Sequence, residues 1–263
     1  MKIETLAIHS ASLTVYLRDA EEVMPMAQAR PLVLVVPGGG YSHVSPREGD
    51  PVAVRFLAAG YHAAVLRYSV GEQAQNYLPL KQIDGALAAL RAHADEWHIL
   101  PDKIAACGFS AGAHLALSSA VLALPGQASW QERQRPNALI LSYPVVTAGL
   151  FAHRGSFEAL SGSADLASHL AFGLEDKVGP DTPPVFLWHT MDDNTVPVEN
   201  SLLLLSALRR AGVPCEAHLF PHGVHGLSVC TAEVNTPQPH AAHWFALAAE
   251  WLGEVFDWKL GIA

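Results

Sequence analysis

The nine residues GFSAGAHLA, 108–116, hold a serine between two glycines that stand two positions to either side, in the pattern G-x-S-x-G. The apolar run KIAACGF (103–109) leads into this stretch, and a helix-forming run starts at His114. The combination predicts a sharp strand-to-helix turn that exposes Ser110 at the top of a sheet. Glycines suit so tight a turn because a side chain there would clash with the neighbouring strand and helix.

Apolar runs alternate with helix-period segments along the rest of the chain. Several runs are apolar without alternation, as expected for strands that are covered on both faces. The alternation predicts right-handed βαβ units and a mostly parallel, doubly wound α/β sheet with helices on both faces. The strand-like runs are 13–17, 31–37, 62–70, 103–109, 138–146, 184–190 and 216–221, and helical patterns cover 80–97, 199–212 and 241–256.

The length of 263 residues, half of them apolar, suffices for one α/β domain with a sizeable core. We therefore expect a single domain over residues 1–263. Residues 147–182 break the strand–helix alternation with a weak helical pattern, many Gly and Ser residues and two His residues. A connection this long inside a compact domain is usually functional, so we expect a small lid-like insertion over the carboxyl edge of the sheet.

The composition argues against several kinds of partner. With 16 Lys and Arg against 25 Asp and Glu, the net charge is −9, and no basic cluster stands out. Nucleic acid and anionic membranes are therefore unexpected partners. No run approaches the roughly 18 consecutive apolar residues of a membrane span. We expect a small-molecule substrate, and the sequence carries no signal for an oligomeric state.

The cysteines and the N-terminal stretch indicate a compartment. Cys107, Cys215 and Cys230 are an odd number without a C-x-x-C pair, which favours reduced thiols over a disulfide framework. The stretch MKIETLAIHSASLTVYL has one lysine and no continuous apolar region, which disfavours a secretory signal. We therefore expect a cytoplasmic protein.

A serine hydroxyl is a weak nucleophile until a base takes its proton, and the chain has 14 histidines. His225 is the candidate base because it lies in the Gly-rich loop FPHGVHGLS, after the last strand-like run. His222 in the same loop is its nearest rival. His114 lies one helical turn beyond Ser110, and we expect it to be a buried or hydrogen-bonded helix residue.

The base needs a carboxylate that fixes its tautomer and stabilises the imidazolium. The stretch FLWHTMDDNTVP places Asp192 and Asp193 just after the strand-like run 184–190. The resulting order of serine, acid and histidine is known for triads built on this kind of turn. Either acid could face inward, so the residues alone leave the choice between them open.

Donors for a tetrahedral oxyanion are expected in VVPGGGYSH, 35–43. Three glycines after a strand leave the backbone N–H groups of Gly39 and Gly40 approachable, and the N–H of Ala111 follows the nucleophile. A dinucleotide phosphate is an alternative ligand for such a loop, but the G-x-G-x-x-G spacing is absent. The histidine pairs in HGVH (222–225) and HAAH (240–243) have no cysteine or acid cluster nearby, so we expect neither a metal nor a cofactor.

With these parts in this order, the sequence resembles the α/β-hydrolase superfamily. Within it the chain is similar to small bacterial esterases and lipases related to acetyl esterases and acetylxylan esterases. In such enzymes the acid begins a D-x-x-V-P pattern and the base precedes a glycine, so the resemblance favours Asp193 over Asp192 and supports His225. The similarity extends over nearly the whole chain, in VVPGGGYSHVSPREGDPVAVRFLAAGYHAAVLRYSV, ILPDKIAACGFSAGAHLA and TPPVFLWHTMDDNTVPVENSLLLLSALRRAGVPCEAHLFPHGVHGLS.

The chain departs from related enzymes at two positions. Pro37 stands where relatives of the hormone-sensitive-lipase type carry a histidine before the three glycines, and Ala113 stands where their serine motif often continues with glycine. The first departure removes no catalytic group, but it means that the oxyanion loop needs support from elsewhere.

The resemblance implies a serine carboxylesterase with the α/β-hydrolase fold. Ser110 would be the nucleophile, His225 the base and Asp193 the acid, and short acyl esters would be the substrates, acetyl esters foremost and acetylated sugars among them. A prolyl-oligopeptidase-like serine peptidase is one alternative, although that type normally adds a propeller domain. A non-catalytic binding protein on the same fold is another, although such a protein would be expected to lack a triad member.

Overall fold

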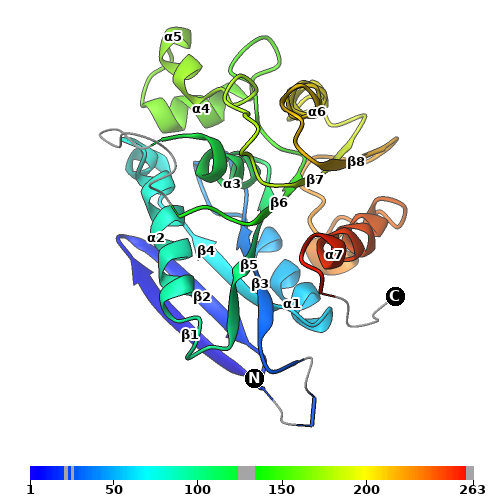
Figure 1. Ribbon diagram of the computed structural model, residues 1–263. Helices are drawn as coiled ribbons and strands as arrows, with labels where there is room; N and C mark the ends of the chain where they lie inside the picture. The colour runs from blue at the N-terminus through cyan, green and yellow to red at the C-terminus, as the bar shows by residue number, and fades with distance from the viewer. Residues whose placement is uncertain (21–22, 25–26, 124–133, 259–263) are drawn as a thin grey trace.

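The computed structural model describes residues 1–20, 23–24, 27–123 and 134–258. Eight strands of these residues form one sheet (Figure 1), in the order β1-β2-β4-β3-β5-β6-β7-β8. The pairs β1–β2 and β2–β4 are antiparallel and all other pairs are parallel. The strands are β1 (Lys2–Ile8), β2 (Ala11–Leu17), β3 (Arg30–Val36), β4 (His62–Arg67), β5 (Ile99–Phe109), β6 (Ala138–Ser142), β7 (Val185–Thr190) and β8 (Cys215–Phe220).

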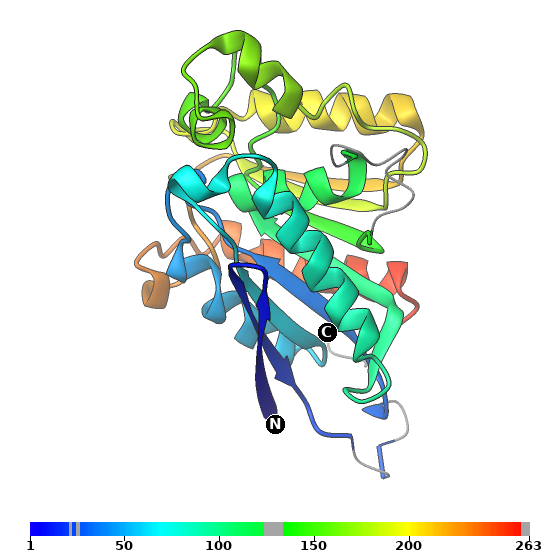
Figure 2. The same ribbon diagram turned by 90° about the vertical axis from the view of Figure 1, so that its left-hand side faces the viewer.

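Helices cover both faces of this sheet, as the sequence predicts. Helices α1 and α7 lie on one face, while α2, α3 and α6 lie on the other (Figures 1 and 2). The helices are α1 (Asp50–Ala58), α2 (Leu78–Ala92), α3 (Ala111–Val121), α4 (Arg154–Ser161), α5 (Leu166–His169), α6 (Glu199–Ala211) and α7 (Trp244–Val255).

Alternate residues of the parallel strands point to opposite faces of the sheet and pack into two separate apolar cores, one on each face. In β3, Val33 and Val35 pack with α1 and α7, while Leu32 and Leu34 pack with α2, α3 and α6. Every residue of β3 is buried. A strand covered on both faces needs no polar alternation, which is why these runs are continuously apolar. The observed architecture is a doubly wound α/β sheet.

Several element boundaries differ from the predicted ones. Strand β1 and helix α1 were not among the predicted elements, because β1 is an exposed edge strand and α1 opens with proline in a charged stretch. The predicted strand 138–146 ends at Ser142, because Tyr143 adopts a φ of 37° that turns the chain away from the sheet. The predicted helix 80–97 spans Leu78–Ala92, and its end is followed by turns up to β5. Residues Ala241–His243, the start of the predicted helix 241–256, form a 3₁₀ turn before α7.

Residues 147–182 hold two short helices, α4 and α5, and a 3₁₀ turn at Leu170–Phe172. They form the top of the molecule in Figures 1 and 2, beyond the carboxyl ends of the strands. The side-chain oxygen of Asn200, in the first turn of α6, accepts hydrogen bonds from the N–H groups of Val146 (2.9 Å) and Thr147 (3.1 Å) and so holds the start of the segment. The lid function expected for this segment stays a prediction.

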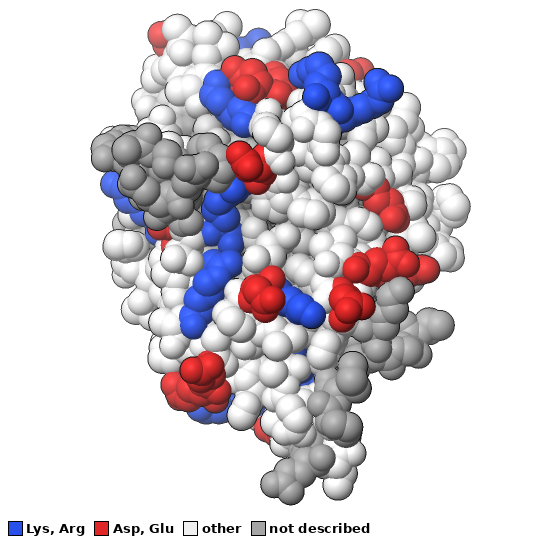
Figure 3. Space-filling model, in the orientation of Figure 1, with Lys and Arg blue, Asp and Glu red and all other residues white. Residues whose placement is uncertain are grey.

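The surface shows no large field of one sign on the face seen in Figure 3. Basic and acidic side chains are interspersed there, and much of the surface carries neither. None of the helices in the described parts of the chain is long and apolar enough to cross a membrane.

Candidate active site

Ser110 occupies the turn between β5 and α3, with φ 53° and ψ −119°. Two close approaches hold this turn. A Cβ on Gly112 would lie 2.1 Å from the carbonyl oxygen of Val36, and a Cβ on Gly108 would lie 2.5 Å from the Cα of Ala113. Both positions therefore require glycine, and the serine is kept in a backbone region that side chains rarely adopt. This is the sharp turn that the G-x-S-x-G pattern predicts.

A continuous hydrogen-bonded chain joins Ser110 to His225 and Asp193. His225 Nε2 lies 2.8 Å from Ser110 Oγ, and His225 Nδ1 lies 2.6 Å from Asp193 Oδ2. Because an ionised carboxylate can only accept, Nδ1 carries the proton and the lone pair of Nε2 faces the serine hydroxyl. The three side chains come from loops after β5, β7 and β8, whose carboxyl ends meet at one edge of the sheet.

Asp193 is buried and held by four donors. Its Oδ1 accepts from the N–H groups of Thr195 (2.9 Å) and Val196 (3.0 Å), and its Oδ2 accepts from His225 and from His189 Nε2 (3.2 Å). Burial alone would raise the pKa of Asp193, but the hydrogen bonds from His189 and His225 and the electrostatic interaction with His225 outweigh it and hold this pKa well below its usual range. The carboxyl group is therefore ionised at neutral pH.

The neighbouring acid points the other way. Asp192 accepts from the N–H of Gly223 (2.7 Å) and lies 3.2 Å from His222 Nδ1. The side chains of Asp192 and His222 are 51% and 79% exposed, whereas that of Asp193 is fully buried. Asp192 and His222 thus form a surface pair outside the chain of contacts to Ser110.

His114, the other rival for the base, is a buried helix residue, as predicted. Its Nε2 donates to the carbonyl oxygen of Phe172 (2.8 Å), so its Nδ1 accepts from the hydroxyl of Tyr41 (2.8 Å). Burial lowers the pKa of His114 to about 4, although the Phe172 carbonyl opposes this shift. Both ring nitrogens are engaged away from Ser110.

The glycines after β3 form a loop that approaches Ser110. Gly39 and Gly40 have φ values of 123° and 61°, which favour glycine. Within the described residues, the N–H groups of Gly39, Gly40 and Ala111 have no hydrogen-bond acceptor. The structure thus leaves free the three N–H groups that the sequence predicts as oxyanion donors.

Pro37 stands where related enzymes carry a histidine, and in this protein Glu48 is the side chain that holds the glycine loop. The buried carboxylate of Glu48 accepts from the N–H of Gly38 (2.9 Å) at one oxygen and from the hydroxyl of Tyr143 (2.7 Å) at the other. Tyr143 also accepts from the N–H of Ser228 (2.9 Å), three residues after His225. One carboxylate therefore ties the glycine loop to the loop of the candidate base.

Sequence reasoning missed Glu48, because in the charged stretch PREGD it has the pattern of a surface residue. It also missed His189, which is fully buried in β7. Nε2 of His189 faces two acceptors, Asp193 Oδ2 and the carbonyl oxygen of Val196 (3.0 Å), so it donates, while Nδ1 accepts from the hydroxyl of Ser201 (2.7 Å). His189 therefore orients Asp193. A histidine inside an otherwise apolar run was the one signal for it.

A third missed residue comes from the segment 147–182. Its residue His153 lies over the glycine loop, with Cε1 3.6 Å from the position that a Cβ on Gly40 would take. His225 and Asp193 both interact electrostatically with His153. Nothing in the sequence around His153 distinguishes it from His169, the other histidine of the segment.

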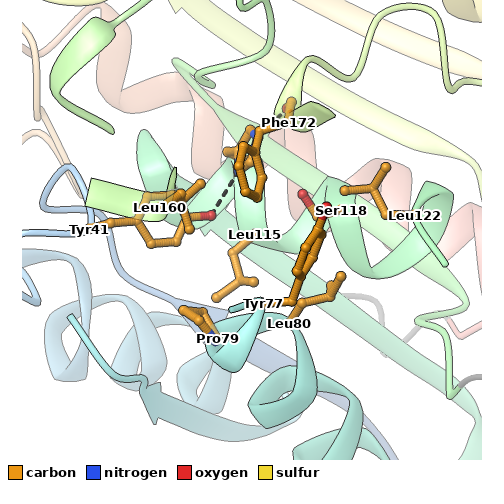
Figure 4. Close-up of a pocket in the computed structure, with 10 residues that line it drawn as sticks. Tyr41, Tyr77, Pro79, Leu80, Leu115, Ser118, Leu122, Leu160 and Phe172 are labelled. Carbon is orange, nitrogen blue, oxygen red and sulfur yellow. Dashed lines mark hydrogen bonds between the residues drawn. The ribbon is translucent and has the colours of Figure 1, made fainter. Parts of the chain in front are cut away.

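A small apolar pocket lies beside the site (Figure 4). Two of its lining residues connect it with the site: Tyr41 follows the glycine loop, and His114 lies on α3. Ser110 and His225 do not line it. The full lining consists of Tyr41, Tyr77, Pro79, Leu80, His114, Leu115, Ser118, Leu122, Leu160 and Phe172.

The histidine pair of HAAH is engaged locally, because His243 Nδ1 donates to the carbonyl oxygen of His240 (2.9 Å). In the portion of the chain that the structure describes, no three His, Cys, Asp or Glu side chains converge as metal ligands would.

Comparisons with known proteins agree with this fold. The family model described as BD-FAE matches residues 18–134, and that of the prolyl oligopeptidase family matches residues 154–257. The chain is 36% identical to MGS-M1, an α/β hydrolase from a Medee basin deep-sea metagenome library, over 98% of both chains with a TM-score of 0.80. It is 34% identical to an acetyl ester-xyloside bifunctional hydrolase from Caldicellulosiruptor lactoaceticus, over 94% of this chain and 88% of that one, with a TM-score of 0.80.

Two curated relatives are longer proteins. Endo-1,4-beta-xylanase B of Butyrivibrio fibrisolvens is 38% identical over 78% of this chain, and an acetylxylan esterase of Xylanibacter ruminicola is 28% identical over 88% of it. The chain spans 33% and 45% of their respective lengths.

The fold, the serine turn and these likenesses define the class: the chain belongs to the α/β-hydrolase family. Within that family it falls in the esterase group, with acetylxylan esterase and carboxylesterase relatives.

Proposed function

We propose that this protein is a serine carboxylesterase that hydrolyses short-chain esters, acetyl esters foremost, with acetylated sugars among its substrates. The observation that carries the proposal is the chain of hydrogen bonds from Ser110 through His225 to the buried Asp193. The names of similar proteins, an acetylxylan esterase and an acetyl ester-xyloside hydrolase, support the acetyl and sugar parts of the proposal.

In the first half of the reaction, Ser110 Oγ attacks the ester carbonyl carbon while His225 Nε2 takes its proton. Asp193 stabilises the resulting imidazolium through Nδ1. The carbonyl oxygen becomes an oxyanion, which the N–H groups of Gly39, Gly40 and Ala111 stabilise. The bond from the carbonyl carbon to the alcohol oxygen then breaks, and His225 gives its proton to the departing alcohol.

In the second half, water attacks the acyl group on Ser110 and His225 takes a proton from that water. The same donors stabilise the second oxyanion. The ester bond to Ser110 breaks, His225 returns the proton to the serine oxygen, and the carboxylic acid leaves. The fixed positions of Asp193 and the glycine loop mean that little reorganisation is needed when charge develops.

A serine peptidase is the second candidate, because the prolyl oligopeptidase family model matches residues 154–257. The same three side chains would serve either reaction. Esterase activity is favoured by the acetyl ester hydrolase that is 34% identical over most of both chains. Peptide 4-nitroanilides in the substrate panel would separate the two, since a peptidase would cleave them at rates comparable to those of esters.

The test is an ester panel from 4-nitrophenyl acetate to 4-nitrophenyl decanoate, with acetylated xylosides, run on the natural protein and on Ser110→Ala. We expect the highest kcat/KM on acetate and a loss of about 10⁴-fold or more in kcat for Ser110→Ala, since only binding and the oxyanion donors remain. A folded Ser110→Ala protein that keeps more than about a tenth of the rate would contradict the nucleophile assignment. Faster turnover of decanoate than of acetate would contradict the acyl preference.

A further inference from the structure

His153 reaches the candidate site from the segment 147–182, at the start of α4. Its ring lies against Gly40 of the oxyanion loop, with Cε1 3.6 Å from the site of a Cβ there. It also interacts electrostatically with His225 and Asp193. His153 therefore lies beside the predicted oxyanion donors and within electrostatic range of the candidate base.

The neighbour of His153 fixes its tautomer. Nδ1 lies 2.8 Å from the hydroxyl oxygen of Ser156, which is fully buried. If Nδ1 carried the proton, the Ser156 hydroxyl would accept, and its own hydrogen would need another acceptor. Among the described residues Ser156 Oγ has no other hydrogen-bond partner, and a buried hydroxyl hydrogen left without an acceptor is destabilising. Ser156 therefore donates to Nδ1, and Nε2 carries the proton.

The ring is neutral and leaves one donor free. Burial lowers the pKa of His153, and the electrostatic interaction with His225 lowers it further, against an opposing effect of Asp193. A neutral imidazole has one donor and one acceptor, and the acceptor is occupied by Ser156. Nε2 has no hydrogen-bond partner among the described residues, and it is not among the fully enclosed polar atoms. Solvent can thus reach this N–H, and Cε1, a ring atom bonded to Nε2, is the atom that lies beside Gly40.

We propose that His153 Nε2–H donates a hydrogen bond to a hydroxyl or ring oxygen in the alcohol portion of the substrate. This inference rests on the proposed esterase function, in which His225 gives a proton to the departing alcohol, so the alcohol portion must lie beside His225. A sugar offers several oxygen acceptors near its acetylated position, whereas a nitrophenol offers none in the same region. His153 therefore selects for esters of carbohydrate-like alcohols.

The test compares His153→Leu, which removes the donor at similar volume, with His153→Gln, which returns an N–H near the position of Nε2. Each variant is assayed on a monoacetylated methyl xyloside and on 4-nitrophenyl acetate. We expect His153→Leu to lose about three- to tenfold in kcat/KM on the xyloside, mainly through KM, because it removes one neutral hydrogen bond to the substrate. Its rate on 4-nitrophenyl acetate should change by less than about twofold, and His153→Gln should recover most of the loss.

Two control variants distinguish the effect of losing the Nε2 donor from the effect of changing the residues around His153. Arg154→Ala alters the exposed neighbour of His153 and should leave both rates unchanged. Ser156→Ala frees Nδ1, so the ring can adopt either tautomer, and it should give a smaller loss on the xyloside than His153→Leu does.

Different failures have different meanings. An equal loss on both esters would assign His153 to the ester group itself or to the shape of the glycine loop, and would overturn the inference. No loss on either ester, or a natural protein that hydrolyses 4-nitrophenyl acetate but not the xyloside, would overturn it as well. A natural protein that hydrolyses neither ester would overturn the proposed function and this inference with it.

Discussion

Asp193→Asn should lower kcat for ester hydrolysis severely, while Asp192→Asn should change it little. In the natural protein Asp193 Oδ1 accepts two backbone N–H groups, those of Thr195 and Val196. An asparagine amide keeps these two bonds only if its oxygen takes the place of Oδ1. Its NH₂ group then faces Nδ1 of His225, where the natural contact is 2.6 Å. Two donors cannot meet, so the imidazole moves its proton to Nε2.

The consequence for turnover follows from that tautomer. A protonated Nε2 cannot take the proton of the serine hydroxyl, and the same substitution in a serine-protease triad lowers kcat by about 10⁴-fold. That loss is about 5 kcal/mol of transition-state stabilisation at about 1.4 kcal/mol per tenfold change. Asp192 is half exposed, and its side-chain partners among the described residues are His222 and Gly223, so the loss in Asp192→Asn should stay within about tenfold.

The assay measures kcat for 4-nitrophenyl acetate with both single variants, while circular dichroism and thermal melting check that each folds. Because the two variants differ by one position in one loop, each is the matched control of the other. A larger loss in Asp192→Asn than in Asp193→Asn would refute the assignment of the acid. Equal small losses would refute the tautomer argument.

Three substitutions outside the proposed triad should each change one property. Glu48→Ala should lower kcat by about 10²-fold with little change in KM, because the glycine loop loses its anchor and oxyanion donors shift; an unchanged kcat would contradict the anchoring role. Gly112→Ala should lower Tm markedly, because its Cβ would lie 2.1 Å from a strand carbonyl oxygen, whereas Gly179→Ala, with no atom within 4 Å, should not. The pKa of His114 is about 4 in the folded protein, below the ordinary 6.5 that it has in the unfolded chain. As the pH falls from 6.5 to 4, the unfolded chain therefore binds a proton at His114 that the folded protein does not bind, and the free energy of unfolding drops by about 3 kcal/mol. Urea unfolding of His114→Gln across this range should show a shallower loss, and an identical slope would contradict the argument.

The fold was predictable because it depends on patterns within short stretches. Continuous apolar runs such as β3 and β7 indicate strands covered on both faces, and the helices between them indicate a parallel sheet. The edge strand β1 has an alternating, mostly exposed pattern and gave a weaker signal. The ends of β4 and β6 were overestimated, because local composition does not show where the chain must turn at the carboxyl edge.

The candidate site was predictable only where a residue lies in a motif. Ser110 in G-x-S-x-G and His225 before a glycine each follow a strand, and Asp193 was distinguished from Asp192 by the resemblance alone. Their catalytic roles stay predictions. Their distances follow from the sheet, because the carboxyl ends of parallel strands share one edge.

Glu48 and His153 could not be found in the same way. Glu48 acts through Tyr143, 95 positions away in the sequence, and His153 reaches Gly40 from a segment with a weak pattern. Such contacts depend on how the segments pack together. A resemblance that carries over catalytic motifs does not specify the residues that anchor or surround them.

Labelling with a fluorophosphonate most directly tests the central claim that Ser110 is the nucleophile of an ester hydrolase. The reagent bonds to a serine oxygen that a base has activated, and the mass of the intact protein and of its proteolytic peptides locates the adduct. We predict one adduct per chain, on Ser110, with ester hydrolysis falling in proportion to labelling and no adduct on Ser110→Ala. Full labelling of Ser110 with ester hydrolysis intact, or loss of hydrolysis with the adduct on another serine, would contradict the account.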